Sequence, residues 1–414
     1  MRKVRKKLIN KIENEKGAIT ALVLASLLVI TIILINLYIM GSNKSNSQNK
    51  EIKTIQEAYN YTEDKIDLKY KNSIVFEHIN TANTNPKEAL PSNIKEIVEN
   101  DANKGIVIKD KNENEWVWVE VPKTTVFSGL IIDTTKELIE QDYNDIRDRL
   151  IEYVGVYRNG SSYQAKEIWE DEWYEGCGLT PEEYTTIYQK MLKGIYKYGG
   201  FWIGRYEAGI EGSIEDISKA RTSSSSRIEI GTSPKAISQK DAVPYNYIYY
   251  EEAQKLAQNM RPDDNYISSL MFGIQWDLTC KFLEIKGGLT TADINSNSGS
   301  WGIYNNVERI ITSSNAKQEQ WKTQLWTTIK GTKPASGMLL TTGASDEAKK
   351  MNIYDLAGNV WEWTLEKYFK RVNRSIRGGY YDNTSSIYPA SCRSITETSF
   401  VDSHVGFRAM LYEL

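Results

Sequence analysis

The most specific pattern in this sequence is Asn352-Ile-Tyr-Asp-Leu-Ala-Gly-Asn-Val-Trp-Glu-Trp-Thr364. Three shorter motifs follow it: Arg377-Gly-Gly-Tyr380, Arg393 and Gly406-Phe-Arg408. A tryptophan ring buries a large area while its N–H needs a single partner, so we expect Trp361 and Trp363 in the core. The paired glycines predict a tight backbone path. Arg377 and Arg408 are expected to be held by carboxylates or backbone carbonyls.

Upstream motifs extend this pattern toward the N-terminus: Gly204-Arg-Tyr-Glu-Ala208, Pro244-Tyr-Asn-Tyr-Ile-Tyr-Tyr-Glu-Glu-Ala-Gln254 and Gln275-Trp-Asp277. Their order and spacing resemble the formylglycine-generating enzyme (sulfatase-modifying factor) family over about residues 116–414. The resemblance implies an α+β fold class: an irregular, C-type-lectin-like domain with low regular secondary structure.

Residue patterns within this region predict its elements. Alternation of β-formers predicts strands at 116–122 and 200–207. Helical periodicity predicts helices at 132–153, 180–197, 250–260 and 268–283, and Thr180-Pro-Glu-Glu183 is a capped start for the second of these. Polar and glycine-rich composition predicts irregular chain at 211–242 and 288–350.

The N-terminus carries a basic flank and then an uncharged apolar run. Residues 2–16 hold seven Lys or Arg against two Glu, and residues 18–40 hold no charge. As a helix, this run would span roughly 35 Å, enough for a bilayer core of about 30 Å. Basic flanks stay in the cytoplasm, which places the C-terminal domain outside the cell. We therefore expect a single-pass protein of the cell membrane.

The same flank is similar to a type IV prepilin leader, because Lys16-Gly17 immediately precedes the apolar helix. That resemblance implies cleavage after Gly17. Pilins usually carry Glu at the fifth mature position, where this chain has Leu22. The expected organisation is a basic cytoplasmic leader (1–17), a transmembrane helix (18–40), a helical stalk or linker (41–110) and the sulfatase-modifying-factor-like domain (111–414).

Composition excludes several kinds of protein. The 414 residues carry a formal net charge of −3, and the part beyond the leader carries −8, so nothing favours nucleic acid as a partner. Two histidines cannot supply a site that needs three imidazoles. Three cysteines allow at most one intrachain disulfide. We expect them to be small buried side chains.

Family resemblance also bears on catalysis. The enzymes of this family place a redox-active cysteine pair between the Gly-Gly and the later Arg, where it binds copper. Here residues 379–391 contain no cysteine, and Cys392 stands alone beside Arg393. A single thiol cannot reproduce a two-thiolate copper site. We expect no copper and no enzyme activity of this kind.

The family resemblance also implies a structural calcium site. The matching ligands would be the side chains of Asp355 and Glu362 and the backbone carbonyls of Gly358 and Val360. Oxygen ligands of this kind are those that Ca²⁺ prefers. The alternative is a turn in which Asp355 accepts backbone N–H groups.

Tyr, Asn, Ser and Asp dominate residues 380–388 and 394–404. Tyrosine offers rigid amphipathic area and the small polar residues offer adaptable hydrogen bonds, as in recognition surfaces. The composition resembles the variable region of ligand-binding proteins diversified by retroelements. The alternative is that these residues form ordinary solvated loops, which have the same composition. The predicted ligand-binding residues are Tyr380, Tyr381, Asp382, Asn383, Thr384, Tyr388, Thr396, Asp402 and His404.

The sequence is compatible with three functions. The first is a non-catalytic, surface-anchored module that binds an extracellular glycan or protein through these loops. The second is a formylglycine-generating oxidase acting on sulfatase cysteines. The third is a minor pilin-like subunit that displays a lectin-like domain.

Overall fold

The computed structural model describes residues 73–158, 169–212, 234–319, 325–368 and 374–413. The chain divides into two compact units, Met1–Lys69 and Tyr70–Leu414, and every described residue belongs to the second. Within these ranges, no helix is both long and apolar enough to cross a bilayer. The expected leader at 1–17 and membrane helix at 18–40 lie outside the described residues.

A six-stranded sheet joins the two ends of the second unit. Its strand order is β1 (Ile94–Glu99), β2 (Val107–Asp110), β3 (Glu115–Glu120), β5 (Gly200–Gly204), β19 (Ala409–Glu413) and β8 (Tyr266–Leu270), with antiparallel neighbours throughout. The strands predicted at 116–122 and 200–207 are its two central members. Strands β1 and β2 precede β3 in the sequence and belong to the same sheet. The sheet therefore begins before the expected domain boundary at 111 and includes part of the expected stalk.

A second sheet holds the end of the stretch at 352–364, from Trp361 onward. Its order is β17 (Arg393–Thr396), β16 (Arg374–Arg377), β15 (Trp361–Tyr368) and β18 (Val405–Phe407), and β4 (Trp169–Glu170) pairs with the far end of β15. Glu362 lies opposite Arg377 on one side and Gly406 on the other. The three C-terminal motifs therefore lie on strands of one sheet, and β15 stands between the strand of Arg377 and the strand of Gly406.

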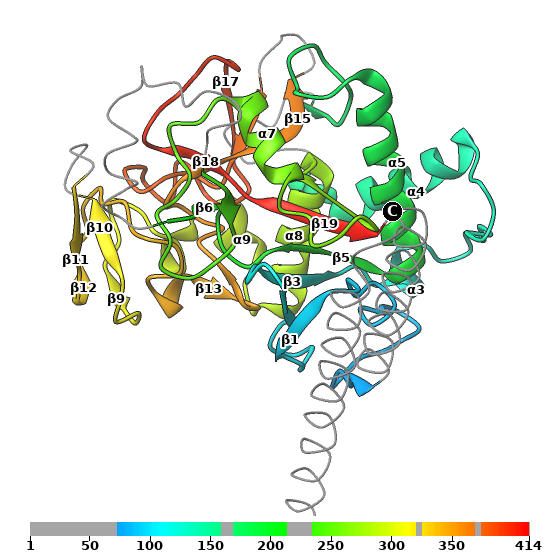
Figure 1. The fold of residues 1–414 in the computed structure, drawn as a ribbon, viewed down its shortest axis with the longest axis horizontal. Coiled ribbons are helices and arrows are strands. Elements are labelled where there is room, and N and C mark those ends of the chain that lie inside the picture. Colours follow the sequence, from blue (N-terminus) through cyan, green and yellow to red (C-terminus); the bar gives the residue numbers. More distant parts are fainter. Residues whose placement is uncertain (1–72, 159–168, 213–233, 320–324, 369–373, 414) are drawn as a thin grey trace, which may run out of the picture. The chain divides into compact units, whose positions relative to one another are not determined.

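Four longer helices pack around the sheets: α4 (Glu140–Val154), α5 (Pro181–Tyr198), α7 (Tyr250–Gln258) and α8 (Gly273–Lys286). The Thr180 hydroxyl accepts the Glu183 N–H at 3.2 Å and caps α5 as predicted. Figure 1 shows α5, in green, beside the red strand β19 near the C-terminus. The helix predicted at 132–153 begins only at Glu140.

The helix predicted at 268–283 is wrong in its first part. Residues 266–270 form strand β8 and pair along their whole length with β19. The helix α8 begins at Gly273, where Asp171 accepts the main-chain N–H groups of Gly273 and Ile274. Apolar residues at helical spacing continued into the strand, so local periodicity alone did not mark the boundary.

Short elements make up the rest, and those within 288–350 agree with the irregular chain predicted there. They comprise α3 (Lys123–Val126), α9 (Thr291–Asn295), β6 (Gly209–Ile210) with β7 (Ala236–Ile237), β9 (Arg309–Ile311) with β12 (Gly331–Lys333), β10 (Lys317–Glu319) with β11 (Trp326–Thr328), β13 (Lys349–Lys350) with β14 (Ile353–Tyr354), and the 3₁₀ turns 155–157, 298–300 and 346–348. In Figure 1 the yellow strands β9 and β10 belong to these pairs.

Large aromatic side chains fill the core. Trp363 is fully buried and Trp361 is 3% exposed, which confirms the prediction for both. Gly378 and Gly379 have φ values of 92° and 79°. A residue with a side chain would be strained in this left-handed conformation. These glycines let the chain leave β16 sharply and begin the loop at 380–388.

Candidate functional site

All three cysteines are buried thiols. Cys177, Cys280 and Cys392 are each 0% exposed, and none of them forms a disulfide. Burial raises the pKa of the Cys177 thiol and raises that of Cys280 to about 12. A neutral thiol sealed from solvent is a weak nucleophile and a poor metal ligand. The expectation of small buried side chains is confirmed.

A cluster of buried charges lies under the second sheet. Glu366 accepts hydrogen bonds from Arg393, Arg158 and Arg377 at 2.8–3.4 Å. Asp277 accepts further bonds from the same guanidinium groups. Burial alone would raise the pKa of Glu366, but the three guanidinium groups lower it to about 2. The cluster ties β15, β16, β17 and α8 together.

Arg408 forms a second buried ion pair. Its guanidinium group contacts both carboxylate oxygens of Glu362 at 2.7–3.1 Å and also donates to the carbonyls of Gly204 and Tyr354. Arg377 donates likewise to carboxylates and to the Ser391 carbonyl. The expected anchoring of both arginines is confirmed.

The four predicted calcium ligands lie on the turn before β15 and at the start of that strand. Asp355 is buried with φ of 56°, and its Oδ2 accepts the Gly343 N–H at 2.7 Å. Gly358 approaches the Ile303 backbone so closely that a Cβ would lie 2.0 Å from the carbonyl oxygen. Val360 is buried, and Glu362 faces Arg408.

Three carboxylates, those of Glu207, Asp355 and Glu362, lie at this turn near one cation, the guanidinium group of Arg408. Glu207 accepts the Val360 N–H at 3.1 Å and the Asn359 amide at 2.6 Å. Burial, with help from Asp355 and Glu362, raises the pKa of Glu207 well above its usual value. Burial also raises the pKa of Asp355 to about 7. The oxygen donors suit calcium in kind, with Arg408 as the competing cation, and the calcium site stays a prediction.

The loop that follows Gly379 is held by its own hydrogen bonds. The Asn383 side chain accepts the Tyr380 N–H at 3.1 Å, and the Asn383 N–H donates back to the Tyr380 carbonyl at 2.9 Å. Asp382 is half-buried. Tyr381 is only 4% exposed and packs against Leu339 and Val360. Tyr381 therefore contributes to the core beneath the loop and not to its surface.

Three further predicted ligand-binding residues, Thr384, Tyr388 and Thr396, lie in this loop and in strand β17. The Thr384 carbonyl accepts the Tyr388 N–H at 3.1 Å and closes a turn. The half-buried Tyr388 ring packs edge-on against the Trp361 ring, with the ring centroids 5.6 Å apart. Thr396 ends β17 and is half-buried.

Three partly exposed rings form what we call the aromatic face: Tyr380, Phe400 and His404. The Tyr380 and His404 rings stack with centroids 4.4 Å apart, and Phe400 lies 5.6 Å from His404. Asp402 accepts His404 Nδ1 at 2.9 Å and orients that ring. Burial opposes ionisation of Asp402, yet the hydrogen bonds from His404 and Ser403 lower its pKa to about 2.

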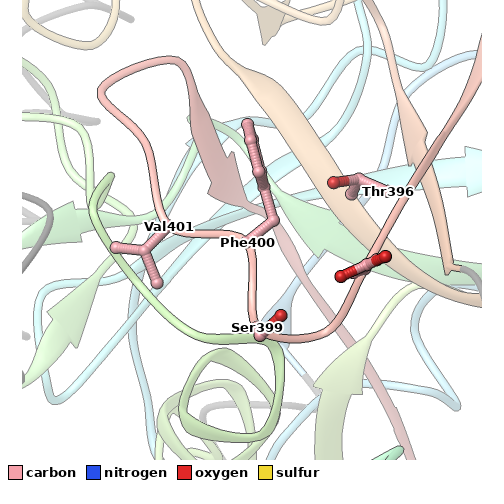
Figure 2. Close-up of a pocket in the computed structure, with 5 residues that line it drawn as sticks. Thr396, Ser399, Phe400 and Val401 are labelled. Carbon is pink, nitrogen blue, oxygen red and sulfur yellow. The ribbon is translucent and has the colours of Figure 1, made fainter.

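A pocket of about 370 Å³ adjoins the aromatic face and is lined by Thr396, Glu397, Ser399, Phe400 and Val401. Figure 2 shows the Phe400 ring standing up from the loop on the same side as Thr396. Sequence reasoning selected Thr396 but missed the other four. An aromatic ring within a run of Ser, Thr and Glu was the signal that could have identified Phe400.

The aromatic face and its pocket are rimmed by acidic groups. Residues 380–388 and 394–404 contain Asp382, Glu397 and Asp402 but no Lys or Arg. The arrangement offers rings for stacking, hydroxyls for hydrogen bonds and carboxylates for cationic or hydroxyl groups of a ligand.

Comparison with known protein families identifies the family of this domain. Residues 193–412 match the family described as Sulfatase-modifying factor enzyme 1-like domain, more than half of the chain. The chain belongs to this family. The matched range holds strands β15 to β18 of the second sheet, α8 and the aromatic face, whereas β4 lies before it.

Two solved structures match part of the chain at low sequence identity. The chain is similar to CarF, at 14% identity and a TM-score of 0.30, over 52% of this chain and 87% of that one. It is also similar to Treponema denticola variable protein 1, at 12% identity and a TM-score of 0.29, over 52% of this chain and 85% of that one. No curated protein matches the sequence.

Proposed function

We propose that this protein is a non-catalytic, surface-anchored ligand-binding module of the sulfatase-modifying-factor family. Its binding site is the aromatic face with the adjoining pocket. The ligand is an extracellular glycan or protein. The observation that carries the proposal is the stack of Tyr380 on His404, partly exposed beside a pocket.

The state of the thiols supports recognition over oxidation. Copper-dependent oxidation needs two accessible thiolates, whereas the three thiols of this chain are sealed in the core. The position beside the later Arg is held by Cys392, whose Sγ lies 3.4 Å from the Arg393 carbonyl. A thiol in this environment has no route to a substrate peptide.

The construction of the face supports binding. The Tyr380 backbone is held by Asn383, and the His404 ring by Asp402, so both rings are positioned before a ligand arrives. Preorganised aromatic side chains lose little entropy on binding. The basic flank and apolar run at the N-terminus support display of this face outside the cell.

The test is a binding panel with the full chain in detergent. Immobilised glycans and cell-surface peptides are probed with the wild type, Tyr380→Ala, His404→Ala and, as a control, Ile131→Ala, which removes a side chain that is 94% exposed outside the face. We expect each face variant to lose about 30-fold in affinity, the size of an interface hot spot of about 2 kcal/mol. Equal affinities for all four proteins would refute the site.

Two alternatives have separate tests. Conversion of a sulfatase peptide cysteine to formylglycine in the presence of copper and oxygen would establish the oxidase. Mass spectrometry of the mature N-terminus decides the pilin-like subunit: a start at Ala18 supports it, and an intact N-terminus excludes it.

A further inference from the structure

One buried amine is held in an unusual way. Lys333, the last residue of β12, is 0% exposed, and within the described residues no carboxylate lies within ion-pair distance of its Nζ. Four main-chain carbonyls surround the amine instead, at 2.9–3.1 Å: those of Tyr304, Val307, Pro334 and Ser336. We call these four carbonyls the carbonyl cage.

The carbonyl cage has the chemistry of a cation site. An ammonium group has three N–H donors and cannot donate one hydrogen bond to each of four carbonyl oxygens. The attraction between its positive charge and the four carbonyl dipoles therefore contributes as much as the individual hydrogen bonds. Rings of backbone carbonyls are what proteins use to replace the hydration shell of potassium. Burial, reinforced by the nearby Arg309 charge, lowers the pKa of Lys333 to about 8, and the amine remains mostly cationic at pH 7.

The cage also supports the loop at 380–388. Residues 304–306, which begin one wall of the cage, form several of the hydrogen bonds between this loop and the rest of the domain. The Tyr304 hydroxyl donates to the Gly378 and Tyr388 carbonyls at 3.0 and 2.9 Å. Asn305 bonds the backbone of Asp382 and Asn383, and Asn306 bonds Ser385 on both its N–H and its hydroxyl.

We propose that residues 304–307 and 334–336 form a cation site that the chain fills with the ammonium group of Lys333, and that this charge positions the 380–388 loop. The ligand class of the emptied site is a small monovalent cation or a primary alkylammonium ion. The proposal concerns the loop alone and holds whether or not the aromatic face binds a ligand.

The test uses two variants of the full chain at pH 7. Lys333→Ala removes the propylammonium part of the side chain and leaves its space empty, while Lys333→Met fills the same space without charge. Hydrogen exchange is followed in 304–307 and 380–388. We expect both variants to exchange at least about tenfold faster, the equivalent of about 1.4 kcal/mol. Added n-propylammonium chloride restores slow exchange in Lys333→Ala only, and tetramethylammonium chloride restores neither.

Two outcomes would overturn the proposal: exchange in Lys333→Met equal to the wild type, or Lys333→Ala that n-propylammonium does not rescue. A third measurement needs no variant. In the ¹⁵N-lysine-labelled wild type, we expect a lysine ammonium signal protected from solvent exchange at pH 7, and its absence would contradict a cation held in the cage. None of these readouts involves a ligand of the aromatic face, so they are independent of the proposed function.

Discussion

Replacing Glu366 by Gln removes the central charge of the buried cluster and keeps its shape. In the wild type, this carboxylate is fully buried and receives hydrogen bonds from Arg158, Arg377 and Arg393. The amide nitrogen of Gln would face guanidinium donors, and their positive charges would lose one partner. Breaking a buried ion pair by removing one side costs about 3–5 kcal/mol. In a unit that spans Tyr70–Leu414, that corresponds to a fall of roughly 4–7 °C in Tm.

Thermal and urea unfolding of the full chain measure this cost. The matched control is Glu172→Gln, which removes a carboxylate that is 66% exposed and 2.9 Å from Lys367. An exposed pair contributes less than about 1 kcal/mol, so this control should change Tm little.

The pH dependence adds a signature. The folded pKa of Glu366, about 2, lies below its unfolded value of 4.5, so its contribution is present above pH 4.5 and is lost as the pH falls toward 2. The difference between wild type and Glu366→Gln should narrow over that interval. Equal stability of Glu366→Gln and Glu172→Gln at pH 7 would refute the reasoning.

Three further predictions follow from the site. Calcium added to chelator-treated protein should raise Tm, because a hundredfold excess over Kd adds about 2.7 kcal/mol of stability. Asp355→Ala, which removes the oxygen ligand, should abolish this gain, and identical Tm values with and without calcium would contradict the calcium prediction. Tyr381→Ala should lower the free energy of unfolding by roughly 3–5 kcal/mol and Tyr380→Ala by less than half as much, measured by urea unfolding; the reverse order would contradict the assigned positions. A thiol reagent at pH 7 should modify none of the three cysteines until the chain unfolds, and rapid labelling of Cys392 would reopen the oxidase.

Much of the fold was predictable where the signal is local. The capping box at Thr180 lies within four residues, and the alternation that marks β3 lies within six. Strand β8 was missed because its partner, β19, lies about 140 residues further along the chain. A strand defined by a distant partner leaves little mark on its own periodicity.

The candidate site shows the same limit. Tyr380 and Tyr381 are adjacent and identical in type, yet one ring is partly exposed and the other is buried. Only the turn after Gly379 decides which is which. Lys333 carries no local signal either, since its four partners are backbone carbonyls from two separate segments.

We propose that the aromatic face, and not a thiol, carries the function. The most direct measurement compares two variants on one binding panel: the full chain with all three cysteines changed to Ala, and the full chain with Tyr380→Ala and His404→Ala. We predict that the cysteine-free protein keeps the ligand profile of the wild type and that the face variant loses it. Loss of binding in the cysteine-free protein, with an unchanged profile in the face variant, would contradict the account.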